Sequence, residues 1–419
     1  MTESTATPSV SRWHARFRAM GPGIMMASAA VGGSHLIAST QAGALYGWQL
    51  ALIIVLANLF KYPFFRFGPQ YTLDTGKSLL EGYAEKGKIY VLAFFVLNVF
   101  ATVVNTAAVG LLCAAILSFV LPGSWSVAVL SVAVLLSVVV ILLVGPYRAV
   151  DGISKLIMIS LTITTVLAVA IAASRGAAMQ ADFVEPSPWN LATLGFIVAL
   201  MGWMPAPIEI SAINSMWVAA KRQIDKVSYE DGLFDFNVGY IGTASLALVF
   251  LALGALVQYG SGEAVQMVGG AYIAQLINMY ASTIGEWSRW LVAFIAFACM
   301  YGTTLTVVDG YSRTNMESFR LLTGGKHRSN RVLAVWVVLA AVFGLCMILF
   351  FKSATGPMLK FAMIASFVTT PVFAWLNLSL IGHTQHKPKP WLMWLAWVGL
   401  LYLSAFTVLF LLNQVGVLK

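Results

Sequence analysis

The chain has 419 residues, of which 59% are hydrophobic and only 10% charged, and apolar runs long enough to cross a bilayer recur from end to end. This composition excludes a water-soluble domain and predicts one polytopic membrane domain over residues 1–419. The net charge of +9 is explained by basic residues in short loops that face anionic headgroups, so we expect contact with lipid and not with nucleic acid.

Hydropathy predicts an all-α integral membrane protein with eleven transmembrane helices. Helices are expected because an isolated segment in lipid must satisfy its own backbone groups. The basic N-terminus lacks a cleavage signal, so residues 1–20 are predicted to be a short tail. The apolar segments lie near residues 21–45, 48–70, 88–120, 125–145, 153–174, 191–218, 235–259, 287–312, 331–351, 357–382 and 391–414.

The distribution of Lys and Arg predicts the orientation. Most of the 25 Lys and Arg residues fall in the loops on the N-terminal side of the membrane. Because positive charge accumulates on the cytoplasmic side, we predict a cytoplasmic N-terminus and an outside C-terminus, in a bacterial inner membrane. The opposite side holds Arg175, Arg289, Lys352, Lys360 and Lys419.

Two of the predicted spans are interrupted. Residues 29–39 read AAVGGSHLIAS, and residues 203–209 read WMPAPIE. Glycine allows backbone conformations outside the helical region, and proline removes an amide donor, so both stretches oppose a continuous helix. Interruptions in spans one and six indicate two inverted five-helix repeats with a substrate site at their shared midplane. The repeats are predicted at about 21–174 and 191–382, followed by an extra helix at about 391–414.

Residues 21–50, GPGIMMASAAVGGSHLIASTQAGALYGWQL, resemble the first helix of the NRAMP (natural resistance-associated macrophage protein) family of secondary transporters. The GPG at 21–23 and the AGA and YGW within 42–48 carry the resemblance. It implies a LeuT-type fold with broken helices 1 and 6, and a transporter instead of an enzyme.

The resemblance also marks where this chain departs from the family. The family's Asp-Pro-Gly-Asn metal motif falls on residues 32–35 and its Met-Pro-His on residues 204–206. The methionine is present, but the aspartate, asparagine and histidine are not, so the chain resembles a divergent member of the family that lacks the usual metal-site motifs. The implied substrate-binding residues are Gly32, Gly33, Ser34, His35, Met204, Pro205 and Ala206.

The residues at the breaks favour an anion. A half-helix restarting after Gly33 would direct the amides of Ser34, His35 and Leu36 into the gap, with the positive end of its dipole. We therefore expect import of a small inorganic anion such as bicarbonate. The alternative is a proton-coupled transporter of manganese or magnesium, favoured by the resemblance and by Met204. A sensor on a carrier scaffold is a third hypothesis.

An ion gradient is the expected energy source, because no phosphate-binding loop occurs in the sequence. The LeuT-type fold implies sodium between carbonyls of Ala29, Ala30 and Gly32 and the hydroxyls of Thr303 and Thr304.

Proton coupling through Glu209 or His35 is the rival hypothesis. Lys61 lies within a span, where a lysine costs roughly 2.5–3.5 kcal/mol on insertion scales, so it faces either a cavity or the headgroups. No cofactor and no obligatory protein partner are expected.

Overall fold

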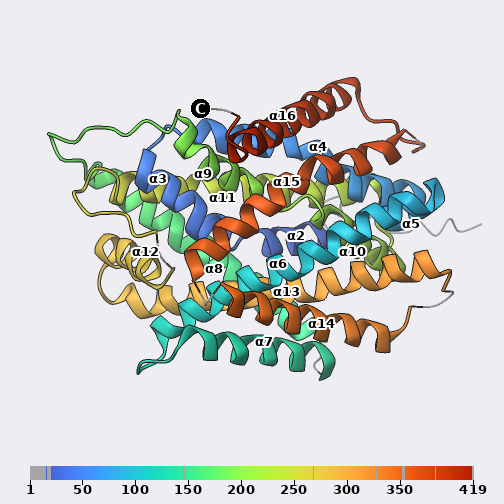
Figure 1. Ribbon diagram of the computed structural model, residues 1–419, viewed down its shortest axis with the longest axis horizontal. Helices are drawn as coiled ribbons and strands as arrows, with labels where there is room; N and C mark the ends of the chain where they lie inside the picture. The colour runs from blue at the N-terminus through green and yellow to red at the C-terminus, as the bar shows by residue number, and fades with distance from the viewer. Residues whose placement is uncertain are drawn as a thin grey trace, which may run out of the picture.

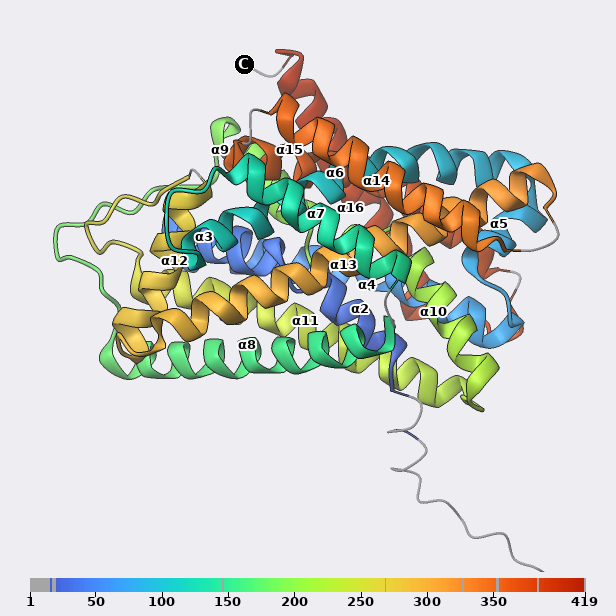
Figure 2. The same cartoon turned by 90° about the horizontal axis from the view of Figure 1, so that it is seen from below.

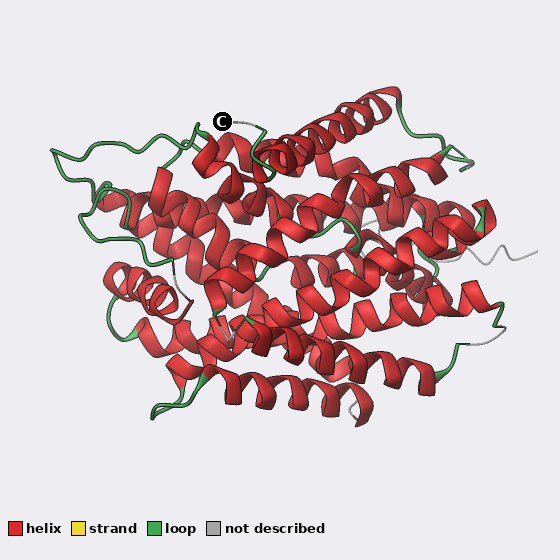
Figure 3. Ribbon diagram, in the orientation of Figure 1, coloured by secondary structure: helices red, strands yellow, loops and turns green. Residues whose placement is uncertain are grey.

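The computed structural model describes residues 16, 20–144, 147–267, 269–325, 328–351, 354–382 and 384–417. Within these ranges the regular structure is helical, without strands (Figure 3). The long helices run side by side along the longest axis of the molecule, and the loops gather at its two ends (Figure 1). Large apolar side chains such as Leu136, Ile163 and Val342 are exposed on outward faces, as expected for surfaces that contact lipid.

Nine described helices are long and apolar enough to cross a membrane. They are α4 (Ala51–Thr75), α6 (Lys88–Val120), α7 (Val127–Val144), α8 (Tyr147–Arg175), α11 (Tyr229–Val257), α13 (Ser288–Thr323), α14 (Asn330–Phe350), α15 (Thr355–Ile381) and α16 (Pro390–Gln414).

Two further spans are broken, as the sequence predicted. The first consists of α2 (Pro22–Ala30), a bend at Val31 and Gly32, and then η1 (Ser34–Ser39) and α3 (Thr40–Tyr46). The second consists of α9 (Leu191–Gly202) and α10 (Ile210–Ile224), separated by the segment with two prolines. With the nine continuous helices these make eleven spans among the described residues, which confirms the predicted number of spans and the breaks in the first and sixth.

Helix α11 holds both halves of the first span through glycine contacts. A Cβ on Gly23 would collide with the backbone of Asp235, and one on Gly43 would collide with the carbonyl of Leu251. The Asp235 carboxylate also accepts hydrogen bonds from the amides of Gly21 and Gly23, at 3.1 and 2.6 Å. Because small residues allow such close approach, the position of the break is fixed against α11.

Two short helices were not predicted. Helix α5 (Leu79–Lys86) follows α4, and α12 (Gly269–Ile284) precedes α13. They lie at opposite ends of the bundle (Figures 1 and 2). The search for apolar runs missed both, because neither forms a run long enough to span; α5 instead begins with a capping box formed by Ser78 and Glu81.

Candidate functional site at the two helix breaks

A cavity of about 30 Å³ lies where the two breaks meet. Since one water needs roughly 10–15 Å³ of such space, the cavity has room for a solute of only a few heavy atoms. Among the described residues, no Asp, Glu, Lys, Arg or His side chain lines it. Its lining residues are Ala29, Ala30, Gly32, Gly33, Ser34, Asn105, Val109, Trp203, Ala206, Pro207, Ile210, Thr303, Val307 and Tyr311.

The structure places four of the seven predicted substrate residues in this lining: Gly32, Gly33, Ser34 and Ala206. His35 is not among them. Its Nε2 donates a hydrogen bond to the Thr243 carbonyl on α11 at 3.0 Å, and its ring meets Phe250 edge-on. The predicted contact of His35 with a substrate is therefore corrected, because the helix rotation directs the imidazole into the interface with α11.

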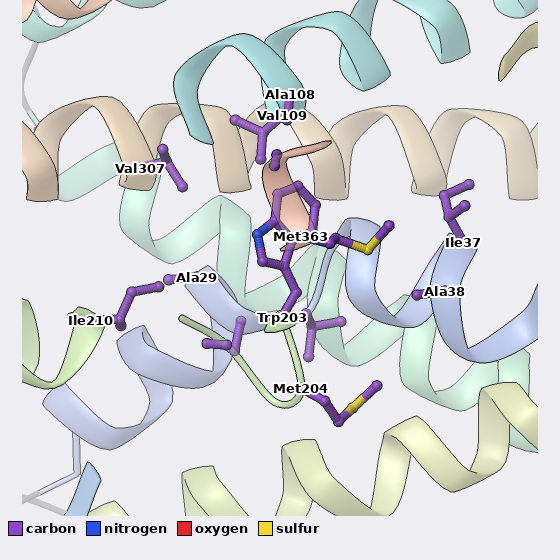
Figure 4. Packing of buried hydrophobic residues seen from close by; sticks show 14 of the residues in the cluster. Ala29, Ile37, Ala38, Ala108, Val109, Trp203, Met204, Ile210, Val307 and Met363 are labelled. Carbon is purple, nitrogen blue, oxygen red and sulfur yellow. The ribbon is translucent and has the colours of Figure 1, made fainter. Parts of the chain in front are cut away.

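Met204 and Pro205 do not line the cavity either. The Met204 side chain is fully buried and points away from Trp203 (Figure 4). A thioether in this position offers no ligand to an ion at the centre of the break. Among the described residues, no group of three or more His, Cys, Asp and Glu side chains could hold a metal ion.

Several backbone amides at the restarted helices are already hydrogen-bonded. Those of His35 and Leu36 donate to the Gly32 carbonyl at 3.1 and 2.9 Å. At the start of α10, the amide of Ile210 donates to the Pro207 carbonyl at 3.2 Å. Local turns thus use the His35 and Leu36 amides, two of the three donors that the predicted anion site required, so side chains and long-range charge must contribute to holding an anion.

Lys61 provides such a charge. Its side chain extends from α4 and is fully buried. The ammonium donates to the carbonyls of Met201 and Gly202 at 2.7 and 2.8 Å, and to that of Ala206 at 3.3 Å. The carbonyls of Met201 and Gly202 form the negative end of α9, which would otherwise attract a cation. Lys61 therefore faces the break and not the headgroups, although it does not line the cavity itself.

A polar chain that the sequence analysis missed crosses the cavity. Trp203 Nε1 donates to Asn105 Oδ1 at 3.0 Å, and Asn105 Nδ2 donates to the Tyr311 hydroxyl at 3.0 Å. The Tyr311 hydroxyl in turn donates to Glu209 Oε1 at 2.9 Å. Asn105 interrupts an apolar span, and such a residue inside a membrane helix is the signal that identifies it.

Glu209 ends this chain in a fully enclosed position. The side chain is 1% exposed, and its Oε2 has no hydrogen-bond partner among the described residues. It also interacts electrostatically with Lys61 across the break. A buried carboxyl with a free oxygen is able to hold a proton or to compensate the charge of a neighbouring cation.

The two predicted threonines face different helices. Thr303 Oγ1 lies 3.2 Å from the Val31 carbonyl and 3.5 Å from the Ser28 carbonyl, both at the end of α2. Each hydroxyl also bonds to a carbonyl of its own helix, Thr303 to Cys299 at 3.1 Å and Thr304 to Met300 at 2.8 Å. Thr304 Oγ1 differs in its second contact, which is the Val109 carbonyl of α6 at 3.4 Å. Only Thr303 is therefore placed to share an ion with the break.

The carbonyls expected to complete that ion site also differ from those observed. The Ala30 carbonyl accepts a hydrogen bond from Ser34 Oγ at 3.0 Å, and the Gly32 carbonyl accepts those of the restarting helix. Ala29 lines the cavity, but the carbonyls next to Thr303 are those of Ser28 and Val31. The turn at the break causes this difference, because the Ala30 and Gly32 carbonyls, which the sequence analysis assumed to be free, accept hydrogen bonds within the turn.

Several solved transporter structures share this architecture. A mutant of the manganese transporter of Eremococcus coleocola superposes with a TM-score of 0.70 at 14% identity, covering 97% of this chain and 88% of that one. MhsT in complex with L-phenylalanine gives 0.63 at 11% identity, covering 93% and 98%. Mhp1, a nucleobase-cation-symport-1 family transporter, gives 0.62 at 16% identity, covering 98% and 91%. At these identities the likeness establishes the fold alone.

No protein-family model matches the chain. A curated relative, the uncharacterized protein PM0681 of Pasteurella multocida (strain Pm70), is 68% identical over 419 residues, covering 99% of this chain and 97% of that protein. The fold is that of LeuT-type secondary transporters, which include an NRAMP-like manganese transporter. The chain thus belongs to the same family as Pasteurella multocida PM0681 and is an integral membrane protein with the transporter fold.

Proposed function

We propose that the protein is a secondary transporter that moves a small planar anion, with bicarbonate the first species to test, using the sodium gradient. The observation that carries the proposal is the Lys61 ammonium on the carbonyl end of α9, at 2.7 and 2.8 Å from two of its carbonyl oxygens. A built-in cation at this position repels a divalent metal ion and attracts an anion to the same break.

The cavity lining supports the same conclusion. Its polar side chains are neutral, namely those of Ser34, Asn105, Trp203, Thr303 and Tyr311. Hydroxyl and amide groups bind a planar oxyanion by hydrogen bonds, whereas a divalent metal ion needs ligands with negative charge. The space of about 30 Å³ is consistent with a solute of this size.

Sodium coupling is supported by Thr303. Its hydroxyl and the carbonyls of Ser28 and Val31 bring oxygen atoms from α13 and α2 together at the break. Oxygen ligands suit a hard cation, and unwound backbone supplies them in carriers of this fold. An ion bound there would order the same segment that lines the substrate cavity, so each ion should raise the affinity for the other.

Proton coupling is the second candidate, and one observation favours it. Glu209 Oε2 is buried and has no hydrogen-bond partner in the part of the chain that the structure describes, while Oε1 accepts from Tyr311 at 2.9 Å. Protonation of that free oxygen would remove the negative charge that faces Lys61. The charge of the break would then change by one unit during each transport cycle, which is the requirement for symport of a proton.

Uptake into proteoliposomes tests the proposal. Labelled bicarbonate, manganese and magnesium are supplied in turn, with a sodium gradient or a pH gradient, at alkaline pH and against protein-free vesicles to correct for leakage of CO₂. We expect sodium-dependent bicarbonate uptake that is lost in Lys61→Met. Arg66→Met is the matched control, because Arg66 contacts Tyr62 on the same helix at 3.1 Å instead of the carbonyls of α9.

Two results would assign a different function. Uptake driven by the pH gradient, indifferent to sodium and abolished in Glu209→Gln, would establish proton symport. Manganese or magnesium uptake by wild-type vesicles that take up no bicarbonate would contradict anion transport and support the divalent-metal alternative, which rests on the similarity in fold to the manganese transporter of Eremococcus coleocola.

A further inference from the structure

A second cavity lies close to the central one. It has a volume of about 390 Å³ and is more than ten times larger than the central cavity. Its lining comes from η1, α3, α6, α9, α12 and α15, and so includes the short helix α12 at one end of the bundle. We name it the α12-side vestibule, and it includes Ile37, Ala38, Leu112, Lys360 and Met363.

Trp203 lies between the two spaces. Figure 4 shows Ala29, Ile210 and Val307, which line the central cavity, on one side of its indole, and Ile37, Ala38 and Met363, which line the vestibule, on the other. The indole is 5% exposed. Trp203 lines the central cavity, whereas Leu112 and Met363 line the vestibule, so the indole and these two side chains together separate the two spaces.

The indole is held in one orientation. Its Nε1 donates to Asn105 Oδ1 at 3.0 Å and to Ser366 Oγ at 3.2 Å, on two different helices. Its six-membered ring lies against Gly33, where an added Cβ would be 2.8 Å from Cζ3. The absence of a side chain at Gly33 thus provides the space that the ring occupies, and the hydrogen bonds keep it there.

We propose that Trp203 is the plug between the α12-side vestibule and the central cavity, and that it restricts the transported solute to a few heavy atoms. The hydrogen bonds to Asn105 and Ser366 hold the indole in the closed position, and Gly33 leaves the space that its six-membered ring occupies. Movement of the indole away from Gly33 opens the path. The restriction on solute size rests on the proposed anion transport, whereas the plug itself does not.

Thiol labelling tests the plug without any transport measurement. Val109, which lines the central cavity, is replaced by cysteine in a background without Cys113, Cys299 and Cys346. A membrane-impermeant thiol reagent is then applied to the α12 side or to the opposite side of oriented vesicles. We expect slow labelling with Trp203 present and a several-fold faster reaction from the α12 side alone in Trp203→Ala.

The packing of the indole against Gly33 is tested by a double-mutant cycle. Overpacking in Gly33→Ala should lower bicarbonate uptake by roughly tenfold, and Trp203→Ala in the same chain should restore part of it. Gly32→Ala is the matched control. Its Cβ would meet Thr303 and Met300 at 3.2 and 3.4 Å instead of the indole, so Trp203→Ala should not rescue it.

A third experiment tests the size of the solute that reaches the central cavity. Benzoate, a planar carboxylate too large for the central cavity, should compete with bicarbonate only in Trp203→Ala. Unchanged labelling in a folded Trp203→Ala protein would overturn the plug, and Trp203→Leu replaces that variant if it does not fold. Faster labelling in a protein that takes up no bicarbonate would instead retain the plug and reject the proposed substrate.

Discussion

The Lys61 side chain is a buried charge whose partners come from distant parts of the sequence. Its ammonium binds three carbonyls around the second break and interacts with Glu209. Removing one member of such a group leaves the other charge buried without compensation, which typically costs more than the group contributes as a whole. The pair therefore matters for the stability of the break as well as for selectivity.

We expect Lys61→Met to lower the free energy of unfolding by roughly 3–5 kcal/mol, because three carbonyls and Glu209 lose their cation. The double variant Lys61→Met with Glu209→Gln should be more stable than the single Lys61→Met. Thermal unfolding in one detergent measures both. Strictly additive losses would show that the two side chains do not interact, and would contradict the charge coupling across the break.

Thr303 and Thr304 are adjacent residues with different surroundings, and this difference gives a second prediction. Thr303→Ala removes an oxygen next to the Val31 carbonyl and should weaken sodium binding by about 1–3 kcal/mol. Thr304→Ala should leave the sodium dependence of uptake close to that of wild type, because its hydroxyl faces α6. The opposite ranking in sodium titrations of uptake would remove Thr303 from the coupling site.

At the scale of elements, α11 packs along both halves of the broken first span. Gly254 approaches the Thr40 carbonyl, and Gly43 approaches the Leu251 carbonyl, so α3 and α11 pack at backbone distance. We expect Gly254→Ala to destabilise the protein by about 1–3 kcal/mol through overpacking. Gly242→Ala on the same helix meets open space and should have little effect. Equal melting temperatures for the two variants would contradict the close packing.

Several helices extend beyond the apolar segments that predicted them. Helix α13 was predicted over 287–312, but it continues to Thr323. Helix α4 continues past residue 70 to Thr75. Their polar ends remain helical because they make specific contacts: buried Glu317 in α13 binds Arg320 and Arg328 at 2.7 and 2.9 Å. Hydropathy detects the part of a helix that contacts lipid, and not the part that packs at the membrane surface.

At the scale of the whole molecule, an odd number of spans places the two termini on opposite sides of the membrane. The excess of Lys and Arg in the loops on the N-terminal side predicts that this side is cytoplasmic. Alkaline phosphatase fused after residue 419 should therefore be active, and green fluorescent protein at the same position should not fluoresce. Fluorescence of the C-terminal fusion would reverse the predicted orientation.

The sequence by itself determined the all-helical membrane class, the eleven spans and the two breaks. These features depend on local properties: an apolar run of sufficient length becomes a membrane helix, and the paired residues Gly32–Gly33 and Pro205–Pro207 oppose a continuous helix, whereas the prolines inside α4 and α15 leave those helices continuous. For the same reason, part of the site could be predicted, namely the small residues that line the cavity at the breaks.

Only the tertiary structure decided which side chains face the cavity. Ser34 lines it while His35 turns to α11, because neighbouring residues on a helix point in directions that its packing alone fixes. Asn105, Trp203 and Tyr311 meet across long separations in sequence, and Lys61 reaches carbonyls more than 100 residues away. No local pattern records such contacts, since they arise when the two broken spans are packed against α4, α6 and α13.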